Sequence, residues 1–187
     1  MKSTVKEKAR IFLTDYASYN NGTQFEFGHW VDLDQFDSSD DLILYIKKHF
    51  EEADKKSPLP CGTQREEIMI TDFEGFPESL YSESMDFDQL FNYFDAVEDS
   101  SFDLEVIEAY AELGSYSLND LDAFFEALKE SYYGKFSNDE EFAEDTAENF
   151  GFEQPNEWPY NCIDWERAAR DLMIDFNEQD GHYFRSI

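Results

Sequence analysis

The side chains with the clearest chemical pattern are four carboxylates between residues 137 and 151. They are spaced at i, i+3, i+4 and i+7, which places them in one continuous stripe on a helix. Like charges at i and i+4 cost about 0.2–0.5 kcal/mol per pair, and residues 136–166 contain no lysine or arginine to relieve the repulsion. Such a stripe can bind a basic partner, although for one helix alone a solvated acidic face is the better explanation. Its members are Glu141, Glu144, Asp145 and Glu148.

Carboxylates also serve in catalysis and metal binding, but neither use has a specific pattern here. Paired acids can hydrolyse a glycosidic bond, yet 44 Asp and Glu residues allow many pairs and single out none. Asp32, Asp34 and Asp37 begin like an EF-hand loop that lacks the glycine required at its sixth position. The three histidines and two cysteines lack the spacing of a zinc site. We therefore expect no enzyme, and no catalytic, cofactor or metal site.

The charge of the whole chain restricts its partners. The 187 residues include 44 acidic and 14 basic ones, giving a net charge of −30, and 41% are hydrophobic. This apolar content predicts a folded protein rather than a disordered acidic tail. The charge repels nucleic acid and anionic membranes and attracts basic surfaces. At the charge density of duplex DNA, one charge per about 1.7 Å, thirty charges would cover roughly 50 Å.

The acidic residues are concentrated where cations are missing. Residues 66–128 contain eighteen acids and neither lysine nor arginine. Adaptation to brine also favours acidic surfaces, but it does not require 19 phenylalanines and 11 tyrosines. We therefore extend the candidate surface to three acids upstream of the stripe: Asp120, Asp122 and Glu126.

The cysteines and the first residues indicate a cytoplasmic protein. Cys61 and Cys162 are far apart in sequence and do not form a disulfide framework, so we expect free thiols. Residues 1–10 are basic, but no apolar stretch follows them, so they do not predict a signal peptide. No apolar run approaches the length of a membrane span.

The N-terminal part, residues 1–78, is expected to form an α+β module. Strands are predicted at 10–16, 24–31 and 67–73, with an Asn-Asn-Gly turn at 20–22 making a hairpin of the first two. Ser38 or Ser39 caps a helix that ends near Ala53. The expected result is a small three-stranded antiparallel sheet covered by one helix. The predicted buried stripe of that helix is Leu42, Ile43, Ile46 and Phe50.

The middle part, residues 79–130, is expected to be helical. Apolar residues recur at helical spacing from Phe87 to Val97, and again from Leu104 to the stop at Gly114. Ser117, with Asp120, is predicted to cap a third helix. These aromatic-rich stripes predict a core rather than a ligand site.

The last part, residues 131–187, is expected to be a mixed α/β module. Ser137 and Glu140 form a predicted capping box for the acidic helix, and Gly151 ends it. A second helix begins near Asp164, after a loop at 153–158. A turn at 177–181 then leads into a closing strand at 182–187. The residues of the acidic helix predicted to face inward are Phe142, Thr146 and Phe150.

Together these expectations give an α+β protein made of an elongated chain of three small modules. An elongated body relieves self-repulsion between like charges better than a sphere.

Four stretches of the chain, in order, resemble ArdA-type antirestriction proteins. They are residues 10–33 with the YNNG turn and the GHW strand, the DFEGFP segment at 72–77, residues 133–144, and the IDW, ARDL and YF groups at 163–184. The third stretch resembles the antirestriction motif of the family. Its motif residues, expected to build the module or a dimer contact, are Tyr133, Gly134, Phe136 and Ser137.

The resemblance implies a fold, a partner and a function. Family members are elongated three-module proteins that form homodimers, and their acidic surface follows the phosphate track of bent DNA. They are DNA mimics that occupy the DNA-binding groove of Type I restriction–modification enzymes, and they block restriction and often modification. They are typically encoded on mobile elements.

Two other functions stay open on the sequence. The chain could be an acidic interaction or adaptor protein for another basic, nucleic-acid-binding partner. It could also be an enzyme that uses carboxylates. Binding to a Type I methyltransferase core, with DNA as competitor, separates the mimic from the adaptor. Neutralising one carboxylate pair tests the enzyme, because an enzyme would lose its activity and a mimic would lose little binding.

Overall fold

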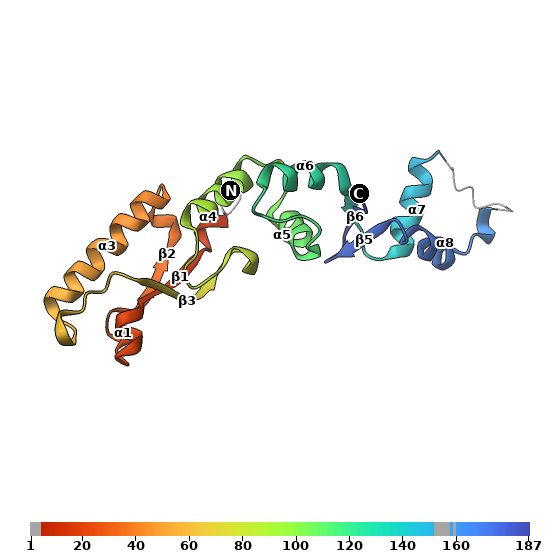
Figure 1. Cartoon of the computed structure of the whole chain (residues 1–187). Coiled ribbons are helices and arrows are strands. Elements are labelled where there is room, and N and C mark those ends of the chain that lie inside the picture. Colours follow the sequence, from red (N-terminus) through yellow and green to blue (C-terminus); the bar gives the residue numbers. More distant parts are fainter. Residues whose placement is uncertain (1–4, 152–157, 159) are drawn as a thin grey trace. The chain divides into compact units, whose positions relative to one another are not determined.

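The computed structural model describes residues 5–151, 158 and 160–187 (Figure 1). The chain divides into two compact units, Met1–Leu104 (unit 1) and Glu105–Ile187 (unit 2). Each unit combines helices with a three-stranded antiparallel sheet, so the predicted α+β class is confirmed. The finer division into three modules stays a prediction, and the loop expected at 153–158 lies almost wholly outside the described residues.

The sheet of unit 1 has the strand order β2-β1-β3. The strands are β1 (Arg10–Asp15), β2 (His29–Asp32) and β3 (Ile68–Glu74), each antiparallel to its neighbour. Ile11 and Leu13 of the central strand are completely buried. The three predicted strands therefore exist, but the second is much shorter than expected.

The predicted strand at 24–31 is wrong in its first half. Two short helices, α1 (Tyr16–Asn20) and α2 (Gln24–Phe27), lie between β1 and β2 in place of a hairpin. The Asp15 carboxylate accepts the N–H of Ser18 at 2.7 Å, which caps α1 and ends β1. Phe25 and Phe27 fit the alternation of a strand, but they lie in α2, whose start at Thr23 has no side-chain cap hydrogen bond that could mark it.

One long helix, α3 (Ser39–Lys56), runs along this sheet (Figure 1). Its cap is Ser38, whose hydroxyl accepts the N–H of Asp41 at 3.2 Å, as predicted. Three of the four residues predicted to be inward are buried, but Ile43 is 46% exposed. The helix buries Leu42, Ile46, Phe50 and Ala53.

Contacts with His29 show which face of the sheet α3 covers. The Tyr45 hydroxyl lies 2.7 Å from His29 Nε2, and the rings of His29 and His49 are 4.4 Å apart. His29 pairs with Leu13 across the strands, so α3 covers the face that carries the buried Leu13. Burial at this contact lowers the pKa of His49.

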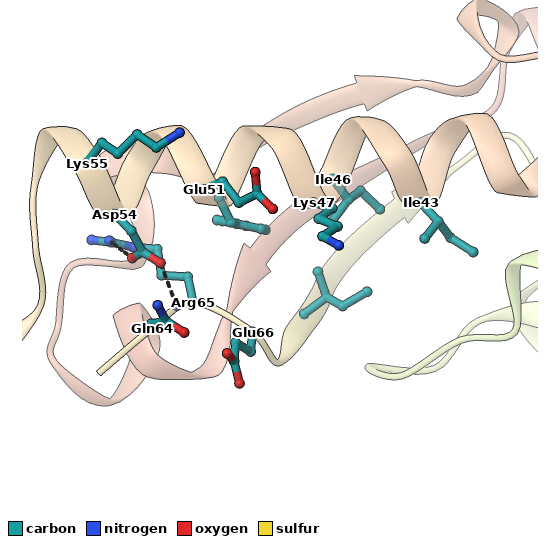
Figure 2. A pocket seen from close by; sticks show the side chains of 11 residues that line it. Ile43, Ile46, Lys47, Glu51, Asp54, Lys55, Gln64, Arg65 and Glu66 are labelled. Atoms are coloured by element: carbon teal, nitrogen blue, oxygen red, sulfur yellow. Dashed lines mark hydrogen bonds and ion pairs between the residues drawn. The ribbon is translucent and has the colours of Figure 1, made fainter. Parts of the chain in front are cut away.

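A groove separates part of α3 from the segment that leads into β3 (Figure 2). Ile43 lines it, which explains the exposure of that side chain. Lys47 and Glu51 extend from the α3 wall and Glu66 lies on the opposite wall.

Arg65 is the buried cation of unit 1. Its Nη1 lies 2.6 Å from Asp54 Oδ1, and its Nε donates to the Ser18 hydroxyl at 2.9 Å. Asp15 Oδ2 lies 3.8 Å from Arg65 Nε, and both of these side chains are almost completely buried. One side chain therefore connects the ends of β1, α3 and the segment before β3.

The remainder of unit 1 confirms the first helix of the predicted helical stretch. Helix α4 (Phe87–Asp99) starts at the Asp86 cap, and the five apolar residues predicted to face inward are buried. The DFEGFP segment passes close to the residues just before β1, where a Cβ on Gly75 would lie 2.2 Å from the Lys8 carbonyl oxygen. Short 3₁₀ turns occupy Val5–Glu7, Leu33–Gln35, Pro60–Gly62 and Glu78–Leu80.

The sheet of unit 2 has the order β4-β6-β5. Its strands are β4 (Tyr132–Lys135), β5 (Phe176–Gln179) and β6 (His182–Arg185). Strand β6 is the predicted closing strand. The turn predicted at 177–181 is largely strand β5, and β4 was not predicted, because both depend on pairing with β6. The helices are α5 (Leu104–Leu113), α6 (Leu121–Ser131), α7 (Asp139–Asn149) and α8 (Trp165–Leu172), with a 3₁₀ turn at Tyr160–Cys162.

Two further expectations can be compared with the structure. Cys61 and Cys162 are free thiols, as predicted, and both are exposed. Among the described residues, none of the helices has both the length and the apolar character that crossing a membrane requires.

Candidate functional site

The acidic helix α7 begins one residue later than predicted. Asn138, not Ser137, is its cap, and the Asn138 side chain accepts the N–H of Glu141 at 2.9 Å. The Glu141 carboxylate in turn accepts the N–H of Ser137 at 2.8 Å. This reciprocal pair satisfies two backbone donors, as a capping box does, but Asn138 and Glu141 replace Ser137 and Glu140.

An aromatic cluster holds α7 against the sheet of unit 2. Phe142 is completely buried, and its ring stacks on Tyr183 of β6 at 4.3 Å between centroids. The rings of Tyr133 and Phe136 contact Phe142 at 5.3 and 5.2 Å, and Phe176 contacts it at 4.9 Å. The aromatic residues of the predicted motif therefore pack inside this unit, and their part in a dimer contact stays a prediction.

Gly134 and Ser137 of the same motif support the start of α7 without packing a side chain into the aromatic cluster. A Cβ on Gly134 would lie 3.0 Å from the ring of Phe136, so a larger residue would push on the aromatic cluster. Ser137 supplies the N–H that Glu141 accepts. The motif therefore begins in β4, with Tyr133 and Gly134, and continues into the connection to α7, with Phe136 and Ser137.

Asp139 takes part in a contact that the sequence did not reveal. Its Oδ1 accepts the Tyr183 hydroxyl at 2.6 Å, which connects the first turn of α7 to β6. Burial and this hydrogen bond raise the pKa of Tyr183. The two residues are 44 positions apart, so no local pattern could have indicated the pair.

The carboxylate stripe lies opposite the buried face of α7. Phe142 and Thr146 are buried as predicted, together with Ala143, but Phe150 is 76% exposed because the helix has already ended. On a helix of 3.6 residues per turn, the centre of the stripe is nearly opposite these buried positions. Glu141 and Glu148, about 10 Å apart along the axis, mark its ends.

The four stripe members differ in exposure and in partners. Glu141 and Glu148 are exposed, whereas Glu144 and Asp145 are half-buried. Asn149 donates to Asp145 at 2.8 Å, and the hydrogen bond from Ser137 lowers the pKa of Glu141. Within the described residues, no salt bridge joins any of the four to a lysine or arginine. Between described residues of unit 2, salt bridges join Arg170 to Glu166 and Lys135 to Glu105.

The upstream acids belong to the same unit and are all exposed. Asp120 is the cap of α6, where it accepts the N–H of Ala123 at 3.1 Å. The predicted cap, Ser117, instead accepts the N–H of Asn119 in the preceding turn. Asp122 and Glu126 follow in α6, four residues apart, so they share one face of that helix.

The described residues contain no group of three or more histidines, cysteines or acids placed to hold a metal ion. What unit 2 presents is a set of exposed carboxylates, fixed on two helices whose other faces are buried. This defines an acidic α+β protein with anionic helical surfaces.

Comparison with known protein families identifies the class more closely. The model of the antirestriction protein (ArdA) family matches residues 11–184, nearly the whole chain, so the chain belongs to that family. Family membership implies a function against restriction–modification enzymes. Comparison with curated proteins and with solved structures gives no significant match.

Proposed function

We propose that the chain is a DNA mimic that binds the DNA-binding groove of a Type I restriction–modification enzyme and blocks both restriction and modification. The observation that carries the proposal is the row of stripe carboxylates on α7 without a cationic partner among the described residues. A groove that binds DNA presents lysine and arginine side chains for the phosphates. Carboxylates on a fixed helix can satisfy the same side chains without presenting any base.

The mechanism follows from electrostatics. A net charge of −30 steers the protein toward a basic groove and makes association fast and salt-dependent. Each exposed ion pair contributes only about 0.2–1 kcal/mol, so affinity accumulates over many pairs. A homodimer, which is part of the proposal, would double the number of carboxylates. We expect both the mimic and its target to be cytoplasmic.

The test is competition for the methyltransferase core of a Type I enzyme. The wild-type chain should displace a duplex that carries the target sequence, and its affinity should fall steeply with added salt. Simultaneous binding of DNA and this protein would contradict the proposal. Equal affinity for unrelated basic DNA-binding proteins would instead favour the adaptor function.

Neutralising Glu144 and Glu148 together tests the stripe. The double Gln variant should bind the core about two- to thirtyfold more weakly, because two ion pairs with the partner are lost, each contributing about 0.2–1 kcal/mol. These positions are chosen because neither caps a helix. The matched control is the double Gln variant at Glu51 and Glu52 in α3, where lysines lie on the same helix. An equal loss in the control would mean that only total charge matters and that the stripe has no special role.

A further inference from the structure

The face of the unit 1 sheet turned away from α3 has a distinct composition. The strand register places Phe12 of β1 opposite Trp30 of β2 and Asp72 of β3. Two residues before Phe12 on β1, and therefore on the same face, Arg10 lies opposite Asp32 and Glu74. Residues directly opposite in neighbouring strands point to the same side, so these six share one face. We call it the aromatic–acidic face and include Phe25 of α2, whose ring lies 6.1 Å from that of Phe12.

This face is separate from the core of unit 1. Successive residues of a strand point to opposite sides, and Ile11 and Leu13 are completely buried toward α3. On the aromatic–acidic face the three carboxylates are exposed and Phe25 is 75% exposed. The apolar ring of Phe25 therefore lies largely in solvent.

Arg10 shows what this face can bind. Its guanidinium lies 4.6 Å above the ring of Trp30, and its Nε and Nη2 lie 2.8 and 2.7 Å from Glu74 Oε2. The cation is thus held by an aromatic ring on one side and a carboxylate on another. The rings of Phe12 and Trp30 meet edge to face at 5.7 Å, so the platform under Arg10 is continuous with Phe12 and, through it, with Phe25.

We propose that the aromatic–acidic face binds arginine side chains of the basic partner, with Phe25 as the exposed ring and Asp32 and Asp72 as counter-charges. Guanidinium groups stack on aromatic rings and pair with carboxylates, which suits this combination better than the compact ammonium of lysine. Exposed aromatics on a sheet can also stack nucleobases, but the carboxylates and the net charge repel phosphates. The inference rests on the proposed function, because it extends contact with the same partner to unit 1.

The first experiment compares two substitutions of Phe25 in the full chain. Phe25→Leu keeps the apolar volume and removes the ring, so it should weaken binding to the methyltransferase core about two- to fivefold. Phe25→Tyr keeps the ring and should bind like the wild type. Leu44→Ala is the control, because Leu44 is exposed on α3, which covers the opposite face. If Phe25→Leu binds as the wild type does while the wild type still competes with DNA, the inference is wrong and the proposed function stands.

A second experiment does not depend on the enzyme. An arginine-rich peptide and its lysine counterpart are titrated into the chain, and the aromatic carbon resonances of Phe25 and Trp30 are followed by NMR. The arginine peptide should shift Phe25 more than the lysine peptide does, and this difference should be absent from the rings of unit 2. Equal shifts, or shifts caused instead by a single-stranded oligonucleotide, would overturn the inference. The peptide titration tests the inference even if the chain fails to bind the methyltransferase core. Failure to bind the core would refute the proposed function but not the preference of this face for arginine.

Discussion

At the scale of single residues, the carboxylates of this protein have two roles: some stabilise the fold and others are available to a partner. Asp15 is buried beside Arg65, and Asp120 and Glu141 satisfy backbone N–H groups at helix starts. Glu144 and Glu148 have no such task and remain available to a partner. The sequence analysis singled out Asp120 and the stripe acids but not Asp15, and it could not separate the two roles, because the distinction depends on hydrogen bonds and burial.

Arg65 is the residue whose loss should cost unit 1 the most. Arg65→Met leaves Asp15 buried without its counter-charge, and breaking a buried pair in this way costs about 3–5 kcal/mol. Urea unfolding, read out by hydrogen exchange of the β1 amides, should show that loss. Removing both partners, with Asp15→Asn and Arg65→Met together, should recover part of it. Lys56→Ala breaks an exposed pair with Glu52 and is the control; an equal cost there would contradict the account.

At the scale of elements, periodicity predicted helices better than strands. The apolar stripe from Phe87 to Val97 is local, and α4 follows it closely. Strand β4 depends on β6, some fifty residues away, and no local signal marks that pairing. The error at 24–31 arose because two phenylalanines two residues apart suit a strand, whereas Gln24–Phe27 form the short helix α2, which has no side-chain cap hydrogen bond to mark its start.

In the candidate site, too, local sequence patterns predicted the helix but not the details that depend on hydrogen-bond geometry. Spacing alone placed the stripe on one face of a helix opposite Phe142, and the structure agrees. Helix caps were shifted, from Ser137 to Asn138 and from Ser117 to Asp120, because several capping residues stand in a row and hydrogen-bond geometry decides between them.

The start of α7 offers a test at this scale. Asn138→Ala removes the acceptor for the Glu141 N–H and should lower the free energy of unfolding by about 1 kcal/mol. Asn138→Asp keeps the acceptor and should retain most of the stability. Amide exchange of Glu141, measured by NMR, should accelerate in the alanine variant alone. Unchanged protection in that variant would mean that the Asn138 side chain does not hold the first turn of α7.

At the scale of the whole molecule, the net charge is expected to affect both the stability of the fold and binding to a partner. A net charge of −30 means that the folded chain repels itself. Salt reduces this repulsion by screening charges that lie farther apart than a Debye length, about 10 Å at 0.1 M. Salt should therefore stabilise the fold while it weakens binding to a basic partner. If salt weakens binding while it raises stability, the weaker binding reflects screening of charges and not a general loss of structure.

Thermal unfolding in sodium chloride measures the first of these effects. The melting temperature should rise with added salt, by about 2–4 °C for each 1 kcal/mol of repulsion relieved. Chloride is preferred to sulfate, which also strengthens apolar burial. A melting temperature that stays constant or falls would show that self-repulsion is a minor part of the stability.

The two exposed thiols have a practical consequence. Cys61 belongs to unit 1 and Cys162 to unit 2, and the sequence holds no other cysteine. A donor dye on one and an acceptor on the other can therefore be attached to the native chain without any substitution. Energy transfer between the dyes would report the spacing of the two halves, first free in solution and then with a target enzyme.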